Sequence, residues 1–246
     1  MNKIRVMVFP GAHNLPLWLM NSVEIEYTKS RDQQIAAIQD GKVDVIHTSP
    51  DNLSLPDATG LKPFLAGTVG PLELVAVQDA TPRQILAVDN PHSGFGRLAY
   101  KWLREHRQNL TYNVISVGGT PQRFESLKTG QATLAVMHPP FTEFCKQAGF
   151  MVMGRVDLGY PTLCAACQED MIQSEGIQSY RQEYEDVLRR LADKEGSSLA
   201  RAALARHLPD LQSELQEDIA EVMRREVIVA GVDFDVKLLS NLNNLP

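Results

Sequence analysis

The sequence contains no apolar run that approaches the roughly 18 residues needed for a membrane-spanning helix. Its first residues also lack the charged and then apolar pattern, with a cleavage site, that marks a secretory signal. We therefore expect no membrane insertion. We expect a cytoplasmic location for the chain as written, or a periplasmic one if a signal segment was removed.

Cysteine is scarce, with only Cys145, Cys164 and Cys167 in 246 residues. An odd number fits reduced thiols better than the disulfide framework of a secreted protein. Cys164 and Cys167 have C-x-x-C spacing, but they lie in an expected strand, where residues three apart point to opposite faces. The sequence therefore does not predict a redox pair.

No basic run with interleaved aromatic residues occurs, and 24 basic against 30 acidic residues give a formal net charge of -6. This composition argues against a nucleic-acid-binding surface and leaves small molecules or proteins as partners. The sequence also lacks HxH and HExxH spacings, a GxGxxG after the first strand, and a P-loop. We therefore expect no metal site and no cofactor.

One helix–strand unit occurs twice, at residues 30–50 and 118–140. A shift of 89 positions aligns Ile35 with Phe124, Ile38 with Leu127, Gly41 with Gly130, and Pro50 with Pro139. Each copy has a short helix, a glycine able to end it, and an apolar strand of the kind a parallel sheet buries. The period is too long for stacked repeats, so the two copies predict two similar α/β lobes with a cleft between them.

The predicted fold class is α/β, with two lobes, two hinge crossings and a helical C-terminal tail packed on lobe 1. Segments rich in proline and glycine mark the crossings, near 78–82 and 159–162. The predicted lobes are residues 1–78 with 163–246 for lobe 1, and residues 83–158 for lobe 2.

Three stretches resemble type II substrate-binding proteins, in the branch that serves nitrate, sulfonate, taurine and thiamine-precursor transporters. They are VFPGAHNLPLW, AAIQDGKVDVIHTSPDN, and the run from DNPHSGFG through VGGTPQRFESLKTGQATLAVMHPPF. The resemblance implies two hinged α/β lobes and a small ligand held between strand-end loops. It also implies an ABC permease as a partner, if the protein is exported.

The candidate ligand site is placed at the carboxyl ends of the strands, where open α/β sheets bind ligands. Asn14 and Thr120 are also expected to cap the helices that follow them. The helix after Ser93 is expected to offer its N-terminus to an anionic group, and Trp18 or Phe141 to cover an apolar ligand face. The candidate ligand-binding residues are His13, Asn14, His47, Ser49, Asp51, Asn52, His92, Ser93, Gly94, Gly119, Thr120 and His138.

Two functions from different classes fit these observations. The first is a protein that captures a small anionic or heteroaromatic metabolite by closing its two lobes. The alternative is a cytoplasmic enzyme on the same fold, such as a lyase or decarboxylase. Its acid–base groups would be His13, His47, His92 or His138 with Asp51 or Asp89. No sequence pattern demonstrates a catalytic group, so binding is the preferred interpretation.

Overall fold

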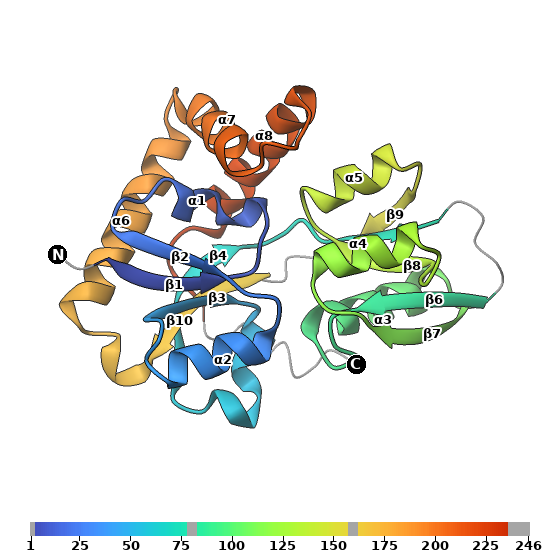
Figure 1. Ribbon diagram of the computed structural model, residues 1–246, viewed down its shortest axis with the longest axis horizontal. Coiled ribbons are helices and arrows are strands. Elements are labelled where there is room, and N and C mark those ends of the chain that lie inside the picture. Colours follow the sequence, from blue (N-terminus) through green and yellow to red (C-terminus); the bar gives the residue numbers. More distant parts are fainter. Residues whose placement is uncertain (1–2, 78–82, 157–161, 236–246) are drawn as a thin grey trace. The chain divides into compact units, whose positions relative to one another are not determined.

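The computed structural model describes residues 3–77, 83–156 and 162–235 (Figure 1). They fall into two compact units. Unit 1 holds residues 3–69 and 162–235, and unit 2 holds residues 70–77 and 83–156. Each unit has its own five-stranded sheet. The predicted two-lobed α/β fold is therefore confirmed.

The sheet of unit 1 has the strand order β2-β1-β3-β10-β4. Its first three strands are parallel, and β10 lies antiparallel between β3 and β4. The 3-10 turn Ala12–Asn14 and the short helix α1 (Leu15–Trp18) follow β1, and α2 (Arg31–Gln39) joins β2 to β3. The strands are β1 (Ile4–Val8), β2 (Val23–Tyr27), β3 (Val45–Thr48), β4 (Leu61–Thr68) and β10 (Leu163–Gln168).

Three C-terminal helices complete unit 1: α6 (Glu175–Ala192), α7 (Gly196–His207) and α8 (Ser213–Ala230). They pack on β1, α1 and β4 respectively. The buried stripe of α6 holds Tyr184 and Val187, two of the core positions that the helical spacing predicts. The predicted packing of a helical tail on lobe 1 is confirmed for the described residues.

The sheet of unit 2 has the order β7-β6-β8-β5-β9, in which β7, β6 and β8 are parallel and β5 is antiparallel to β8 and β9. Its helices are α3 (Gly94–His106), α4 (Thr120–Lys128) and α5 (Phe141–Gln147). The strands are β5 (Glu73–Ala76), β6 (Arg83–Val88), β7 (Thr111–Ser116), β8 (Leu134–Met137) and β9 (Met151–Arg155).

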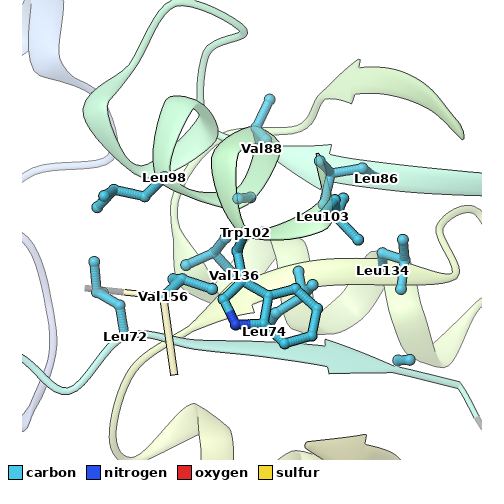
Figure 2. Packing of buried hydrophobic residues seen from close by; sticks show 12 residues of the cluster. Leu72, Leu74, Leu86, Val88, Leu98, Trp102, Leu103, Leu134, Val136 and Val156 are labelled. Atoms are coloured by element: carbon cyan, nitrogen blue, oxygen red, sulfur yellow. The ribbon is translucent and has the colours of Figure 1, made fainter. Parts of the chain in front are cut away.

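Helices cover both faces of the unit 2 sheet. Successive strand residues point to opposite sides, so each face has its own apolar side chains that a helix buries. Figure 2 shows leucine and valine side chains of β5, β6 and β8 gathered around Trp102 of α3. The intervening residues, such as Ala87 and Ala135, pack with Leu127 of α4 on the other face. At Gly154, a Cβ atom would lie 2.6 Å from Cζ2 of Trp102, so the strand β9 approaches the indole too closely for any larger residue.

The sequence repeat is a structural repeat. Helices α2 and α4 have nine residues each and strands β3 and β8 have four, and both pairs are related by the shift of 89 positions. Gly41 and Gly130 both have positive φ, 66° and 73°, and each follows the C-cap residue of its helix. The two sheets also correspond strand by strand, with β7, β6, β8, β5 and β9 in the places of β2, β1, β3, β10 and β4.

The described boundary between the units differs from the predicted one. Residues 70–77 were expected in lobe 1, but β5 pairs with β8 and β9 in the sheet of unit 2. In unit 2, β5 is paired on both sides, and its residues Leu74, Val75 and Ala76 are buried. Because β5 and β6, on either side of residues 78–82, both belong to unit 2, the predicted crossing there is wrong, and the chain passes from unit 1 to unit 2 at residues 69–70. The predicted crossing near 159–162 lies outside the described residues, except for Thr162, and stays a prediction.

Candidate functional site

The loop after β1 is held together by Asn14. Its fully buried Nδ2 donates to the carbonyl oxygens of Phe9 at 2.8 Å and Gly11 at 3.1 Å. Its side chain makes no capping bond to α1, so the predicted capping role is wrong. His13 lies in the same loop, half-buried, with Nε2 3.1 Å from Phe9 O. Asn14 therefore shapes this loop, and His13 is the more accessible of the two candidates.

The loop after β3 lies at the same edge of the sheet, because β1 and β3 are neighbouring parallel strands. Ser49 Oγ donates to Asp51 Oδ1, and Asn52 Nδ2 donates to Thr48 Oγ1 at 2.8 Å. The carbonyl of Asn52 accepts from Arg31 Nη2 at 3.0 Å. The structure thus brings the four predicted residues His13, Ser49, Asp51 and Asn52 to one edge of unit 1.

His47 does not belong to this edge. It lies inside β3 with 3% of its surface exposed, and its Nε2 is 2.6 Å from the hydroxyl of Tyr180 on α6. Burial lowers the pKa of His47 to about 3. The predicted ligand contact by His47 is therefore corrected. The strand continues through Thr48, and its alternation turns the imidazole toward the helix α6 instead of the strand end.

In unit 2 the loop after β6 leads into α3. Ser93 caps this helix, accepting from Gly96 N at 3.1 Å and donating to Asp89 Oδ1 at 2.6 Å. The carboxylate of Asp89 therefore lies beside the N-terminus that was predicted to receive an anionic ligand group. His92 is exposed in this loop, and its backbone N–H donates to Asn90 Oδ1 at 2.8 Å. Direct anion binding by Ser93 and Gly94 stays a prediction.

The start of α4 and the end of β8 meet at the same edge. Thr120 is the first residue of α4, and Gly119 occupies the N-cap position, so Thr120 is not the predicted cap. Instead its Oγ1 lies 2.7 Å from Nε2 of His138, and Nδ1 of His138 lies 3.0 Å from Pro139 O. The pKa of His138 is lowered to about 4, mainly because the ring is buried.

Phe141 stands beside this pair, with its ring perpendicular to that of His138 and the ring centroids 6.5 Å apart. It also contacts Phe124 and Phe144, and it is partly exposed. Trp18, the other predicted aromatic cover, is stacked on His207 at 4.8 Å and donates from Nε1 to Tyr27 Oη at 3.0 Å. One face of Trp18 is thus already covered within unit 1.

Arg123 was missed in the sequence. Its side chain on α4 is 2% exposed, yet it reaches the same edge. Nε donates to Val136 O at 2.9 Å, Nη1 to Gly118 O at 3.2 Å, and Nη2 to Thr120 Oγ1 at 2.8 Å. The shift of 89 positions aligns Arg123 with Gln34, which is also buried and donates to Met7 O and His47 O. A polar residue at the same place in both copies was the available signal.

Cys164 and Cys167 lie in a strand, as predicted from the sequence. Cys164 and Cys167 lie in β10 and are buried, and Cys145 is buried in unit 2. Burial raises the pKa of Cys145 and of Cys167 to about 12 and raises that of Cys164 further. Neutral, enclosed thiols of this kind do not suit redox exchange.

Within residues 3–77, 83–156 and 162–235, no group of three or more His, Cys, Asp or Glu side chains is arranged to hold a metal ion. The expectation of no metal stays a prediction to be tested on the purified protein. Among the same residues, no helix combines the length and apolar character that crossing a membrane requires.

Comparison with family models and with curated proteins finds no match. Solved structures, in contrast, match over nearly the whole chain. The ligand-binding component of an ABC-type import system from Staphylococcus aureus, with zinc bound, has a TM-score of 0.80 and 11% identity, and the match covers 100% of this chain and 91% of that chain.

The alkanesulfonate-binding protein SsuA from Xanthomonas axonopodis pv. citri, bound to MOPS, has a TM-score of 0.76 and 11% identity, covering 99% of this chain and 91% of that one. The periplasmic nitrate-binding protein NrtA from Synechocystis PCC 6803 has a TM-score of 0.73 and 11% identity, covering 89% and 70% respectively. At these identities the similarity establishes the fold, which is that of type II periplasmic binding proteins.

Proposed function

We propose that this chain is a small-molecule-binding protein, with ligand contacts from the strand-end loops of both units. The observation that carries the proposal is the match in fold, over nearly the full chain, to ligand-binding components of import systems. The repeat supports it, because each unit has polar loops at the carboxyl edge of three parallel strands. Closure of the two lobes on the ligand is part of this proposal.

The proposed ligand is a small anionic or heteroaromatic metabolite. Phe141 and His138 present two perpendicular, partly exposed rings, an arrangement that suits a flat or apolar ligand part. The matched proteins named for alkanesulfonate and nitrate support the anionic class. If the chain is exported, we propose the periplasm as its location and an ABC permease as its partner.

The lyase or decarboxylase alternative receives less support from the histidines. His47 is enclosed in the core of unit 1. His138 has a pKa of about 4 and both ring nitrogens within hydrogen-bonding distance of protein atoms, so it is poorly suited to exchange protons near neutral pH. The binding function is therefore the conclusion we prefer.

The proposal is tested by screening sulfonates, nitrate, carboxylates and heteroaromatic metabolites by thermal shift, followed by calorimetric titration of each hit. His13→Ala in unit 1 and His92→Ala in unit 2 probe the two edges, and Glu105→Gln at the exposed end of α3 is the control. We expect each edge variant to weaken binding of the same hit at least tenfold, with the control unchanged. Wild-type affinity in both edge variants would place the ligand elsewhere, and consumption of the hit during incubation would favour the enzyme.

Ser93→Leu would be a poor probe of ligand binding. Ser93 is 8% exposed and caps α3, so leucine there removes the cap and its bond to Asp89. Loss of such a cap costs about 0.5–2 kcal/mol of stability, which would obscure the effect on binding.

A further inference from the structure

We propose that Arg123 is a positioning residue, which holds Thr120 and His138 in one hydrogen-bonded arrangement at the ligand-binding edge of unit 2. The ligand-binding part rests on the proposed function, whereas the arrangement of the side chains does not. Arg123 itself is buried beneath the edge, so it acts on a ligand only through the residues it holds.

The guanidinium connects β8 to the stretch that leads from the end of β7 into α4. Its Nε binds the carbonyl of Val136 in β8, Nη1 binds the carbonyl of Gly118 after β7, and Nη2 binds Thr120 Oγ1 in α4. Nη1 is also 3.9 Å from Oδ1 of Asp89, after β6. One side chain thus bridges the carboxyl ends of all three parallel strands of unit 2.

The direction of each hydrogen bond follows from the groups that can only donate or only accept. Arginine only donates, so Thr120 Oγ1 accepts from Arg123. The carbonyl of Pro139 only accepts, so the ring proton of neutral His138 lies on Nδ1, and Nε2 accepts the hydroxyl proton of Thr120. His138 is therefore held as the neutral tautomer with its proton on Nδ1.

The repeat separates this role from a purely structural one. Gln34, at the matching position of α2, donates to Met7 O and His47 O, which are main-chain atoms of two strand ends. An uncharged amide is therefore sufficient to tie such a helix to its sheet. The added feature in unit 2 is the bond from Arg123 to the side chain of Thr120, and through it to His138.

A buried arginine is normally paired closely with a carboxylate, because an unpaired charge is costly to remove from water. Here the carboxylate of Asp89 is 37% exposed and 3.9 Å away, and the three short bonds of Arg123 go to neutral oxygens. Burying a charged guanidinium costs more free energy than burying a neutral glutamine, which could also donate to two carbonyls. The bond to Thr120, and through it to His138, explains why an arginine occupies this position.

The test replaces Arg123 by the residue that the other copy uses, Arg123→Gln, with Arg104→Gln on the exposed side of α3 as a control of equal charge change. Side-chain ¹⁵N NMR reports the tautomer of His138, and its titration reports protonation. The groups that face His138 include Thr120 and Arg123 of α4, Phe141 of α5 and the Pro139 carbonyl, and Asp89 lies 3.9 Å from Arg123.

We expect wild type and Arg104→Gln to show the Nδ1–H tautomer. Arg123→Gln should shift the ring toward a tautomer mixture and raise its protonation midpoint by at least half a pH unit, because a nearby positive charge is lost. Thr120→Val, which leaves Arg123 in place, should produce the same change of tautomer. An unchanged His138 spectrum and titration in Arg123→Gln would overturn the positioning role.

The ligand part is tested with ethanesulfonate by calorimetry. We expect Arg123→Gln and Thr120→Val each to weaken its binding at least fivefold, and the double variant to be no weaker than the single ones, since both remove one shared arrangement. Equal behaviour of Arg123→Gln and wild type, including no binding by either, would overturn the ligand part while leaving the NMR result to decide the positioning of His138.

Discussion

Acid should destabilise unit 1 through His47, a prediction that follows from the burial of its ring against Tyr180. The pKa of His47 is about 3 in the folded protein, against 6.5 for an ordinary histidine. Above pH 6.5 the ring is neutral in both the folded and the unfolded chain. Below it only the unfolded chain takes up the proton, so the free energy of unfolding falls as the pH falls, until the folded ring titrates near pH 3.

The size of the effect follows from the difference in pKa. Each pH unit between these two values corresponds to about 1.4 kcal/mol, so lowering the pH from 7.5 to 5.0 should remove about 2 kcal/mol through His47 alone. His138, whose pKa is also lowered, adds a similar dependence in unit 2. His47→Gln should abolish the contribution of unit 1, because glutamine can still hydrogen-bond the Tyr180 hydroxyl and does not titrate.

The assay uses the two tryptophans, one in each unit: Trp18 in α1 and Trp102 in α3. In a Trp102→Phe background, urea unfolding followed by fluorescence reports unit 1 through Trp18. Curves at pH 7.5, 6.5, 5.5 and 5.0 give the free energy of unfolding for the background, for His47→Gln and for the exposed control His92→Gln. Parallel pH dependences for the background and His47→Gln would show that the buried ring is not the cause.

Three further predictions concern packing, backbone strain and the thiols. Gly154→Ala should cost about 1–3 kcal/mol in urea unfolding of unit 2, because the new methyl group would overlap Trp102; wild-type stability would mean that the indole moves freely. Gly130→Ala should cost about 1–2 kcal/mol from its φ of 73° alone, since nothing lies within 4 Å of the added atom, and a larger loss would reveal a clash. Cys164 and Cys167 should react with a thiol reagent only after urea unfolding, and rapid reaction of the native protein would contradict their burial.

The repeated unit could be predicted from the sequence because its signals are local. A glycine that ends a helix, a short amphipathic run and a buried strand each depend on residues close together in the chain. Gly41 and Gly130 accordingly have the expected positive φ, and α2, α4, β3 and β8 match the shift of 89 positions. The two-lobed fold follows from that repeat, and the strand positions of Cys164 and Cys167 follow from local patterning as well.

Only the tertiary structure assigned strands to sheets and side chains to surfaces. The run that forms β5 is equally apolar whichever sheet accepts it, and its pairing with β8 depends on residues about sixty positions away. His47 and His138 both follow apolar strand residues, yet one packs under α6 and the other bonds to Thr120. Arg123 looks like a solvated helix residue in the sequence, since charged side chains usually face water. Its burial depends on Val136 of β8 and Asp89 after β6, which lie beside it only in the folded chain.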